Sequence, residues 1–172
     1  MVRIKFRAGS VFSNFGTGLK LIGGNMENNR VRLAGIIPMG DGFAFMHRVG
    51  VQNHPIGDYY TFPGGGQEGE ETLEEGTKRE IKEELGIDVE VVKKLYEMDN
   101  GEQNKKEYFF LCKYISGEFG TGTGPEFSGD LKYAHRGKYL PEIISRKDVE
   151  NILLLPYEIR DKFIEDIKNN KI

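Results

Sequence analysis

The stretch GGQEGEETLEEGTKREIKEELGI, residues 65–87, combines a glycine-rich loop, a helix and a helix stop. Thr72 and Glu75 have the spacing of a capping box, which predicts that the helix begins there. Gly86 predicts its end, because glycine readily takes the left-handed conformation that follows a helix. The helix also carries an apolar stripe that predicts packing on a sheet, formed by Leu73, Ile81 and Leu85.

A second face of this helix is acidic. Glu80, Glu83 and Glu84 stand at i, i+3 and i+4, so their carboxylates fall within roughly a 100° arc. Residues 64–86 contain eight Glu and three basic residues, and like charges at helical spacing repel one another. Oxygen-bound divalent cations would offset that repulsion, and Mg²⁺ is usually held by a few carboxylates plus substrate phosphates. The spacing alone also fits a solvated, Glu-rich helix.

The order of residues in this stretch resembles the Nudix box, the motif of the Nudix hydrolases. That motif reads Gly, any five, Glu, any seven, then Arg-Glu-aliphatic-any-Glu-Glu-any-Gly-aliphatic. Every fixed position is matched here, by Gly65, Glu71, Arg79, Glu80, Ile81, Glu83, Glu84, Gly86 and Ile87. Glu70 departs from similar proteins, which often have Gly just before the first Glu of the box. The box covers 23 of 172 residues, and the resemblance implies a mixed sheet between helices.

The resemblance implies a role for each of these side chains. Glu80, Glu83 and Glu84 would hold Mg²⁺, with Mn²⁺ as a substitute. Glu71 and Arg79 would pair and hold the loop against the helix, which orients the ligands. The backbone would turn tightly beside the site at three glycines, Gly64, Gly65 and Gly66.

Two further site residues are expected outside the box. The attacking water needs a proton acceptor, and the candidates are Glu83, Glu80 and Glu126. Glu126 lies in the glycine-rich segment 116–137, where Glu118 is its nearest rival. Arg48, at the end of a predicted strand, is expected to bind substrate phosphates.

The rest of the chain predicts a mixed α/β sandwich with several strands, one central helix and one terminal helix. Strand patterns cover residues 31–38, 43–49, 59–62, 89–98 and 107–115, with hairpin signals at 39–42 and 99–105. A short helix signal starts at Ser145 and Asp148, and an amphipathic helix is predicted over 156–168. We expect one Nudix domain over residues 26–172, preceded by an N-terminal extension of uncertain origin, residues 1–25.

Composition excludes some classes of function. A net charge of −3 and a pI near 5.7 give no general attraction to nucleic acids or anionic membranes. The only cysteine, Cys112, lies in an apolar run and is expected to be a buried, inert thiol, and a chain without a disulfide framework suits the cytoplasm. The three histidines lack metal-ligand spacing, and the aromatic residues of 59–62 are expected in the core more than on a nucleobase.

The function expected from the resemblance is hydrolysis of the diphosphate linkage in a nucleoside diphosphate derivative. A nucleoside triphosphate, cleaved to monophosphate and pyrophosphate, is the first candidate substrate. ADP-ribose and dinucleoside polyphosphates are alternatives, because the markers for those subclasses beyond the box are not clear. A non-catalytic nucleotide-binding module and an isomerase stay open as other classes, although an isomerase would need a reactive cysteine. A homodimer also stays open.

Overall fold

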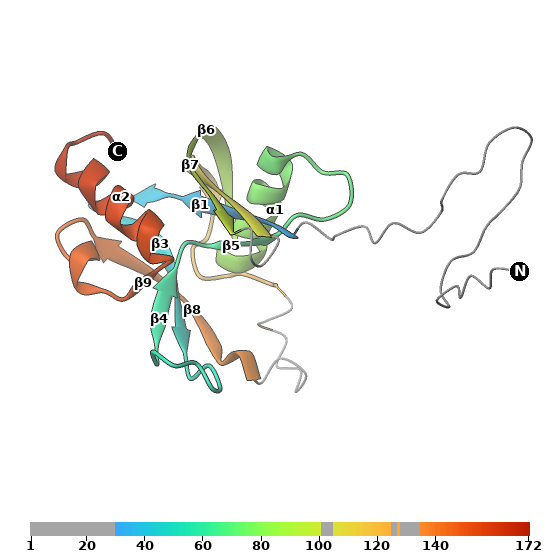
Figure 1. Cartoon of the computed structure of the whole chain (residues 1–172). Coiled ribbons are helices and arrows are strands. Elements are labelled where there is room, and N and C mark those ends of the chain that lie inside the picture. The colour runs from blue at the N-terminus through green and yellow to red at the C-terminus, as the bar shows by residue number, and fades with distance from the viewer. Residues whose placement is uncertain (1–29, 101–104, 125–126, 128–134) are drawn as a thin grey trace, which may run out of the picture.

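The computed structural model describes residues 30–100, 105–124, 127 and 135–172. They form two mixed sheets and two helices (Figure 1). The strands are β1 (Arg30–Ile36), β2 (Pro38–Met39), β3 (Gly42–Val49), β4 (Tyr59–Thr61), β5 (Gly64–Gly66), β6 (Ile87–Asn100), β7 (Lys105–Gly117), β8 (Lys138–Ser145) and β9 (Leu154–Leu155). The helices are α1 (Leu73–Leu85) and α2 (Tyr157–Lys168), and a 3₁₀ turn covers Val149–Asn151. The predicted mixed α/β sandwich is confirmed.

The two sheets have different strand orders. The first sheet runs β5-β1-β7-β6, and the second runs β2-β3-β4-β9 with β8 also paired to β3. Within the first sheet β1 and β7 are parallel, with Arg32 opposite Glu107, whereas β5 pairs with β1 antiparallel. This register brings residues that are far apart in sequence to one edge, beside the glycine strand β5.

Helix α1 begins and ends where local signals predict. The Thr72 hydroxyl oxygen accepts a hydrogen bond from the Glu75 N–H at 3.2 Å, and the Glu75 carboxylate accepts one from the Thr72 N–H at 2.9 Å. Gly86 terminates the helix at a φ of 77°, a conformation that favours glycine. The capping box and the helix stop are therefore confirmed.

Each helix covers one hydrophobic cluster. Under α1, Ile81 and Leu85 pack with Leu33 of β1, and all three side chains are fully buried. Under α2, Phe163 packs edge-to-face against Phe62, with the ring centroids 5.2 Å apart. Each cluster holds one helix against the strands, and Figure 1 shows α1 and α2 on opposite sides of the molecule.

Cys112 lies in the cluster under α1 and is buried, as the sequence predicts. Burial raises the pKa of its thiol to about 12, so the thiolate is scarcely populated at neutral pH.

The strand over Lys138–Ser145 is missing from the sequence-based prediction. It pairs antiparallel with β3 along eight residues, yet it contains Pro141 and lacks a regular alternation of buried and exposed residues. The short helix signal at Ser145 and Asp148 corresponds to the 3₁₀ turn that follows Asp148. The expected N-terminal extension, residues 1–25, lies outside the described residues. Neither described helix has the length and apolar character needed to cross a membrane.

Candidate active site

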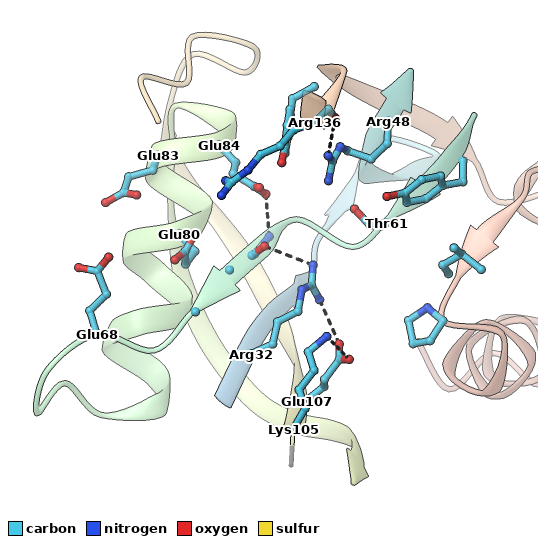
Figure 2. A pocket seen from close by; sticks show the side chains of 17 residues that line it. Arg32, Arg48, Thr61, Glu68, Glu80, Glu83, Glu84, Lys105, Glu107 and Arg136 are labelled. Carbon is cyan, nitrogen blue, oxygen red and sulfur yellow. Dashed lines mark hydrogen bonds and ion pairs between the residues drawn. The ribbon is translucent and has the colours of Figure 1, made fainter. Parts of the chain in front are cut away.

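A pocket of about 470 Å³ lies where α1, the glycine strand β5 and both sheets meet (Figure 2). Three carboxylates of α1 line one side of it: Glu80, Glu83 and Glu84. Basic and aromatic side chains from β1, β3, β4, β7 and β8 line much of the rest, together with Glu68, Glu107, Leu155 and Pro156. The acidic face expected from the box therefore opens into a cavity and is not a solvated helix surface.

The acidic side is packed closely against the loop. Glu84 is only 7% exposed, and its Oε2 accepts a hydrogen bond from the Gly64 N–H at 2.7 Å. A Cβ atom on Gly65 would lie 2.4 Å from Oε2 of Glu80, so a larger residue there would displace this carboxylate. Glu83 is the more accessible of the three, with a side chain 38% exposed. These contacts explain why the loop needs glycine at position 65.

Arg79 connects the loop to the helix. Its Nε donates to Glu71 Oε2 at 3.0 Å, its Nη2 donates to Glu71 Oε1 at 2.8 Å, and Nη2 also donates to the Gly66 carbonyl at 2.8 Å. The hydrogen bonds from Arg79 are the main reason why the pKa of Glu71 lies below its usual value. The structure thus brings together the predicted pair and the glycine loop.

Arg79 also contacts the acidic face itself. Its Nη1 donates to Glu80 Oε1 at 2.9 Å and lies 3.5 Å from Glu83 Oε2. Among the described residues, no group of three or more His, Cys, Asp or Glu is arranged to hold a metal ion directly. The three carboxylates nevertheless suit a hard divalent cation, because they are oxygen donors that line one wall of one pocket. A cation held by all three would compete with Arg79 for oxygens of Glu80 and Glu83, whereas Glu84 can keep one oxygen on the Gly64 N–H.

The opposite wall carries Arg48, as expected for a residue that contacts phosphate. Its guanidinium carbon lies 3.6 Å from the ring centroid of Tyr139, and its Nη2 donates to the Arg136 carbonyl at 2.8 Å. The Arg48 Nε is buried and has no hydrogen-bond partner within the described part of the chain. Stacking on Tyr139 holds the charged guanidinium at the pocket wall.

The floor of the pocket contains an ion triad that sequence reasoning missed. Glu107 is 6% exposed, and it pairs with Lys105 Nζ at 2.7 Å and with Arg32 Nη1 at 3.6 Å. The Arg32 Nη2 also donates to the carbonyls of Phe62 at 2.9 Å and Gly64 at 3.2 Å. Arg32 therefore ties the floor to the start of the glycine loop. Only the parallel register of β1 and β7 reveals this triad.

The remaining predicted residues fall into three groups. Glu126 lies outside the described residues, although Gly124, close before it, donates its N–H to the Glu83 carbonyl at 2.9 Å. Glu118 is exposed and does not line the pocket. Of the aromatic residues in 59–62, Phe62 is in the core as expected, whereas Tyr59 lines the pocket.

Comparisons with known proteins agree with this arrangement. The family described as NUDIX domain matches residues 29–130. A NUDIX hydrolase from Nitrosomonas europaea has a TM-score of 0.62 at 16% identity, over 92% of this chain and 85% of that one. An ADP-ribose pyrophosphatase from Streptococcus suis has a TM-score of 0.50 at 18% identity, over 70% of this chain and 77% of that one. A UDP-X diphosphatase has a TM-score of 0.57 at 16% identity, over 87% and 67%. At such identities the likeness shows the fold alone. No curated protein sequence was found to match the chain significantly.

Proposed function

The chain belongs to the Nudix family and is a hydrolase of phosphorus-containing anhydrides, and we propose that it cleaves the diphosphate linkage of a nucleoside diphosphate derivative. A nucleoside triphosphate, cleaved to monophosphate and pyrophosphate, is the first candidate substrate. The observation that supports this proposal is that negative and positive side chains lie on facing walls of one pocket. Glu80, Glu83 and Glu84 line one wall, and a row of cations faces them across the cavity. Such a pocket suits a diphosphate bound between a metal and basic side chains.

The acidic wall would hold the divalent ion, for which we propose Mg²⁺ with Mn²⁺ as a substitute. When bound, such an ion neutralises charge on phosphate oxygens and activates water. Glu84 is buried and already fixed by the Gly64 N–H, so it is suited to be a rigid ligand. Glu83 is more accessible, and we assign it, with Glu80, the role of accepting the proton of the attacking water; Glu126 is the third candidate.

The other side chains of the site would position the substrate. Arg48 presents a guanidinium that is held from behind by Tyr139, which suits a charge-assisted contact with a phosphate. Arg79 and Glu71 would keep the loop and the helix in register. We extend the proposal to a single Nudix domain over residues 26–172 and to a cytoplasmic protein, which the lack of a disulfide framework favours.

The experiment that tests the proposal is a phosphate-release assay over a panel of substrates. The panel contains nucleoside triphosphates, including oxidised ones, ADP-ribose, a UDP derivative, dinucleoside polyphosphates and NADH, and a coupling enzyme converts the products to phosphate. We expect one class to turn over far faster than the others with Mg²⁺ present. Glu84→Gln should lower that turnover by about 100-fold or more, because it removes a negatively charged ligand.

The matched control is Glu74→Gln, which removes an exposed carboxylate from the same helix outside the pocket. It should keep the activity of the wild type. No turnover of any substrate with either metal would contradict the proposed hydrolase and favour a nucleotide-binding module.

A further inference from the structure

A second hollow, of about 430 Å³, adjoins the active-site pocket at the glycine strand. The two cavities share the side chains of Arg32 and Lys105 and the backbone at Gly65 and Gly66. The two cavities are therefore neighbours at the floor of the site. Figure 2 shows Arg32 and Lys105 beneath the glycine strand.

The described lining of the hollow contains cations and no carboxylate. Arg30, Arg32 and Lys105 line it together with Val31 and Gln67. Arg30 lies directly opposite Lys105 in the parallel pair of strands, and like charges in that arrangement are destabilising. Among the described residues, Glu107 pairs with two of these cations, Arg32 and Lys105.

Arg30 is the exposed member of this group, and its guanidinium has no hydrogen-bond or ion-pair partner among the described residues. Counted over the described residues, the three cations exceed their paired acid, Glu107, by two charges in a chain whose net charge is negative. A Cβ atom on Gly66 would meet nothing within 4 Å, so this position has space for a side chain and the sequence leaves it empty.

We propose that this hollow binds a phosphate group of the substrate that is not part of the linkage hydrolysed. The inference rests on the proposed function and narrows its substrate class. Guanidinium and ammonium groups without enough carboxylate partners suit a phosphate, and guanidinium can bind it with two hydrogen bonds. The additional phosphate has two chemical sources, namely a third phosphate in the chain of a nucleoside triphosphate or a monoester on a ribose.

Matched pairs of substrates test the inference, since the members of each pair differ by one phosphate. The pairs are a nucleoside diphosphate and triphosphate, NADH and NADPH, and dephospho-coenzyme A and coenzyme A. We expect kcat/KM to be roughly tenfold or more higher for the phosphate-rich member of at least one pair, as a charge-assisted contact allows. The pair that shows the preference identifies the source, and the preference should weaken with added salt.

Arg30→Gln should abolish the preference and leave kcat/KM for the phosphate-poor member unchanged, and Arg30→Glu should reverse it. Lys113→Gln is the matched control. It removes one exposed cation from the same strand as Lys105, about 26 Å away at the rise of an extended strand. Lys113→Gln should keep the preference. Equal kcat/KM within every pair, with turnover present, would overturn the inference and leave the proposed function standing.

A binding measurement separates the two proposals when no substrate turns over. Calorimetric titration with 5′-AMP, 2′,5′-ADP, 3′,5′-ADP and inorganic tripolyphosphate needs no catalysis. Roughly tenfold tighter binding of a bisphosphate than of 5′-AMP, or binding of tripolyphosphate that Arg30→Gln weakens by the same factor, would support the hollow as a phosphate site. Equal affinities that do not change in Arg30→Gln would overturn the inference by themselves.

Discussion

Arg79 and Glu71 form two hydrogen bonds with each other, from Nε to Oε2 at 3.0 Å and from Nη2 to Oε1 at 2.8 Å. Both partners are partly buried, with side-chain exposures of 23% and 16%. The planar guanidinium matches the planar carboxylate, so the pair fixes direction as well as distance. This geometry sets the angle between the glycine loop and the helix that carries the acidic face.

Arg79→Lys should lower kcat/KM by about 10- to 100-fold, because an ammonium cannot form both bonds and hold the Gly66 carbonyl. Steady-state kinetics and the affinity for the divalent ion measure this change. Lys78→Gln removes the neighbouring exposed cation and should have little effect. An Arg79→Lys enzyme with the activity of the wild type would show that the two-bond geometry is not needed.

The pair also makes stability depend on pH. The pKa of Glu71 is lowered in the folded state, chiefly by the hydrogen bonds from Arg79. The pair therefore contributes its full stabilisation of the fold above pH 4.5, the ordinary pKa of the carboxyl group. That contribution is lost as the pH falls through the lower pKa that Glu71 has in the folded protein. Urea unfolding should show that the wild type and Glu71→Gln differ in free energy of unfolding by a constant amount near neutral pH. This difference should shrink below about pH 4.5. A difference that stays constant into acid would contradict the lowered pKa.

Removal of divalent ions should abolish turnover. The acidic wall needs a counterion to bind an anionic diphosphate, so EDTA should stop hydrolysis and added Mg²⁺ or Mn²⁺ should restore it. Mg²⁺ should also raise the Tm of the wild type more than that of Glu83→Gln, which gives a readout independent of activity. Full turnover in EDTA would rule out the metal role assigned to these carboxylates.

Arg48→Gln should lower kcat/KM by about 10- to 100-fold if its guanidinium contacts a substrate phosphate. Tyr139→Leu should have a smaller effect in the same direction, because it removes the ring on which Arg48 lies, whereas Tyr139→Phe keeps that ring. Arg146→Gln is the control, since that guanidinium also lies over a ring, 4.7 Å from the centroid of Phe43, but does not line the active-site pocket. Unchanged kinetics for Arg48→Gln would contradict the proposal that Arg48 binds a substrate phosphate.

Cys112 should not react with Ellman's reagent in the folded protein. Burial raises the pKa of its thiol to about 12, and the side chain is fully enclosed under α1. We expect stoichiometric labelling only in guanidinium chloride, with a rate in buffer set by opening of the fold. Rapid labelling of the folded protein would reopen the isomerase alternative, which needs an accessible nucleophile.

Local signals explain what the sequence could predict. Helix α1 is set by Thr72, Glu75 and Gly86, all within a few residues of its ends, and its stripes follow from the helical period. The family motif then identifies the acidic face. Strand β8 is different, because its position depends on pairing with β3, about 95 residues earlier, and Pro141 interrupts its strand pattern. Its place therefore follows from tertiary contacts.

The ion triad on the pocket floor could not be predicted from the sequence, because it too depends on tertiary contacts. Arg30 and Arg32 are read from the sequence as charges near a strand start, and Lys105 and Glu107 as charges near another. Only a parallel register, with Arg32 opposite Glu107, places them together. The sequence therefore predicted the site residues that lie on one helix. It did not predict the site residues that the pairing of two distant strands brings together.

The parallel pairing of β1 with β7 also bears on how the protein is made. The strand β1 leaves the ribosome first, and its partner Glu107 follows Arg32 by 75 residues. At about 5 to 20 residues per second, β1 waits roughly 4 to 15 seconds for that partner. During this time its apolar half, Leu33 to Ile36, has no β7 to pair with. We expect this interval to be the point at which the nascent chain is most prone to aggregate and most in need of a chaperone.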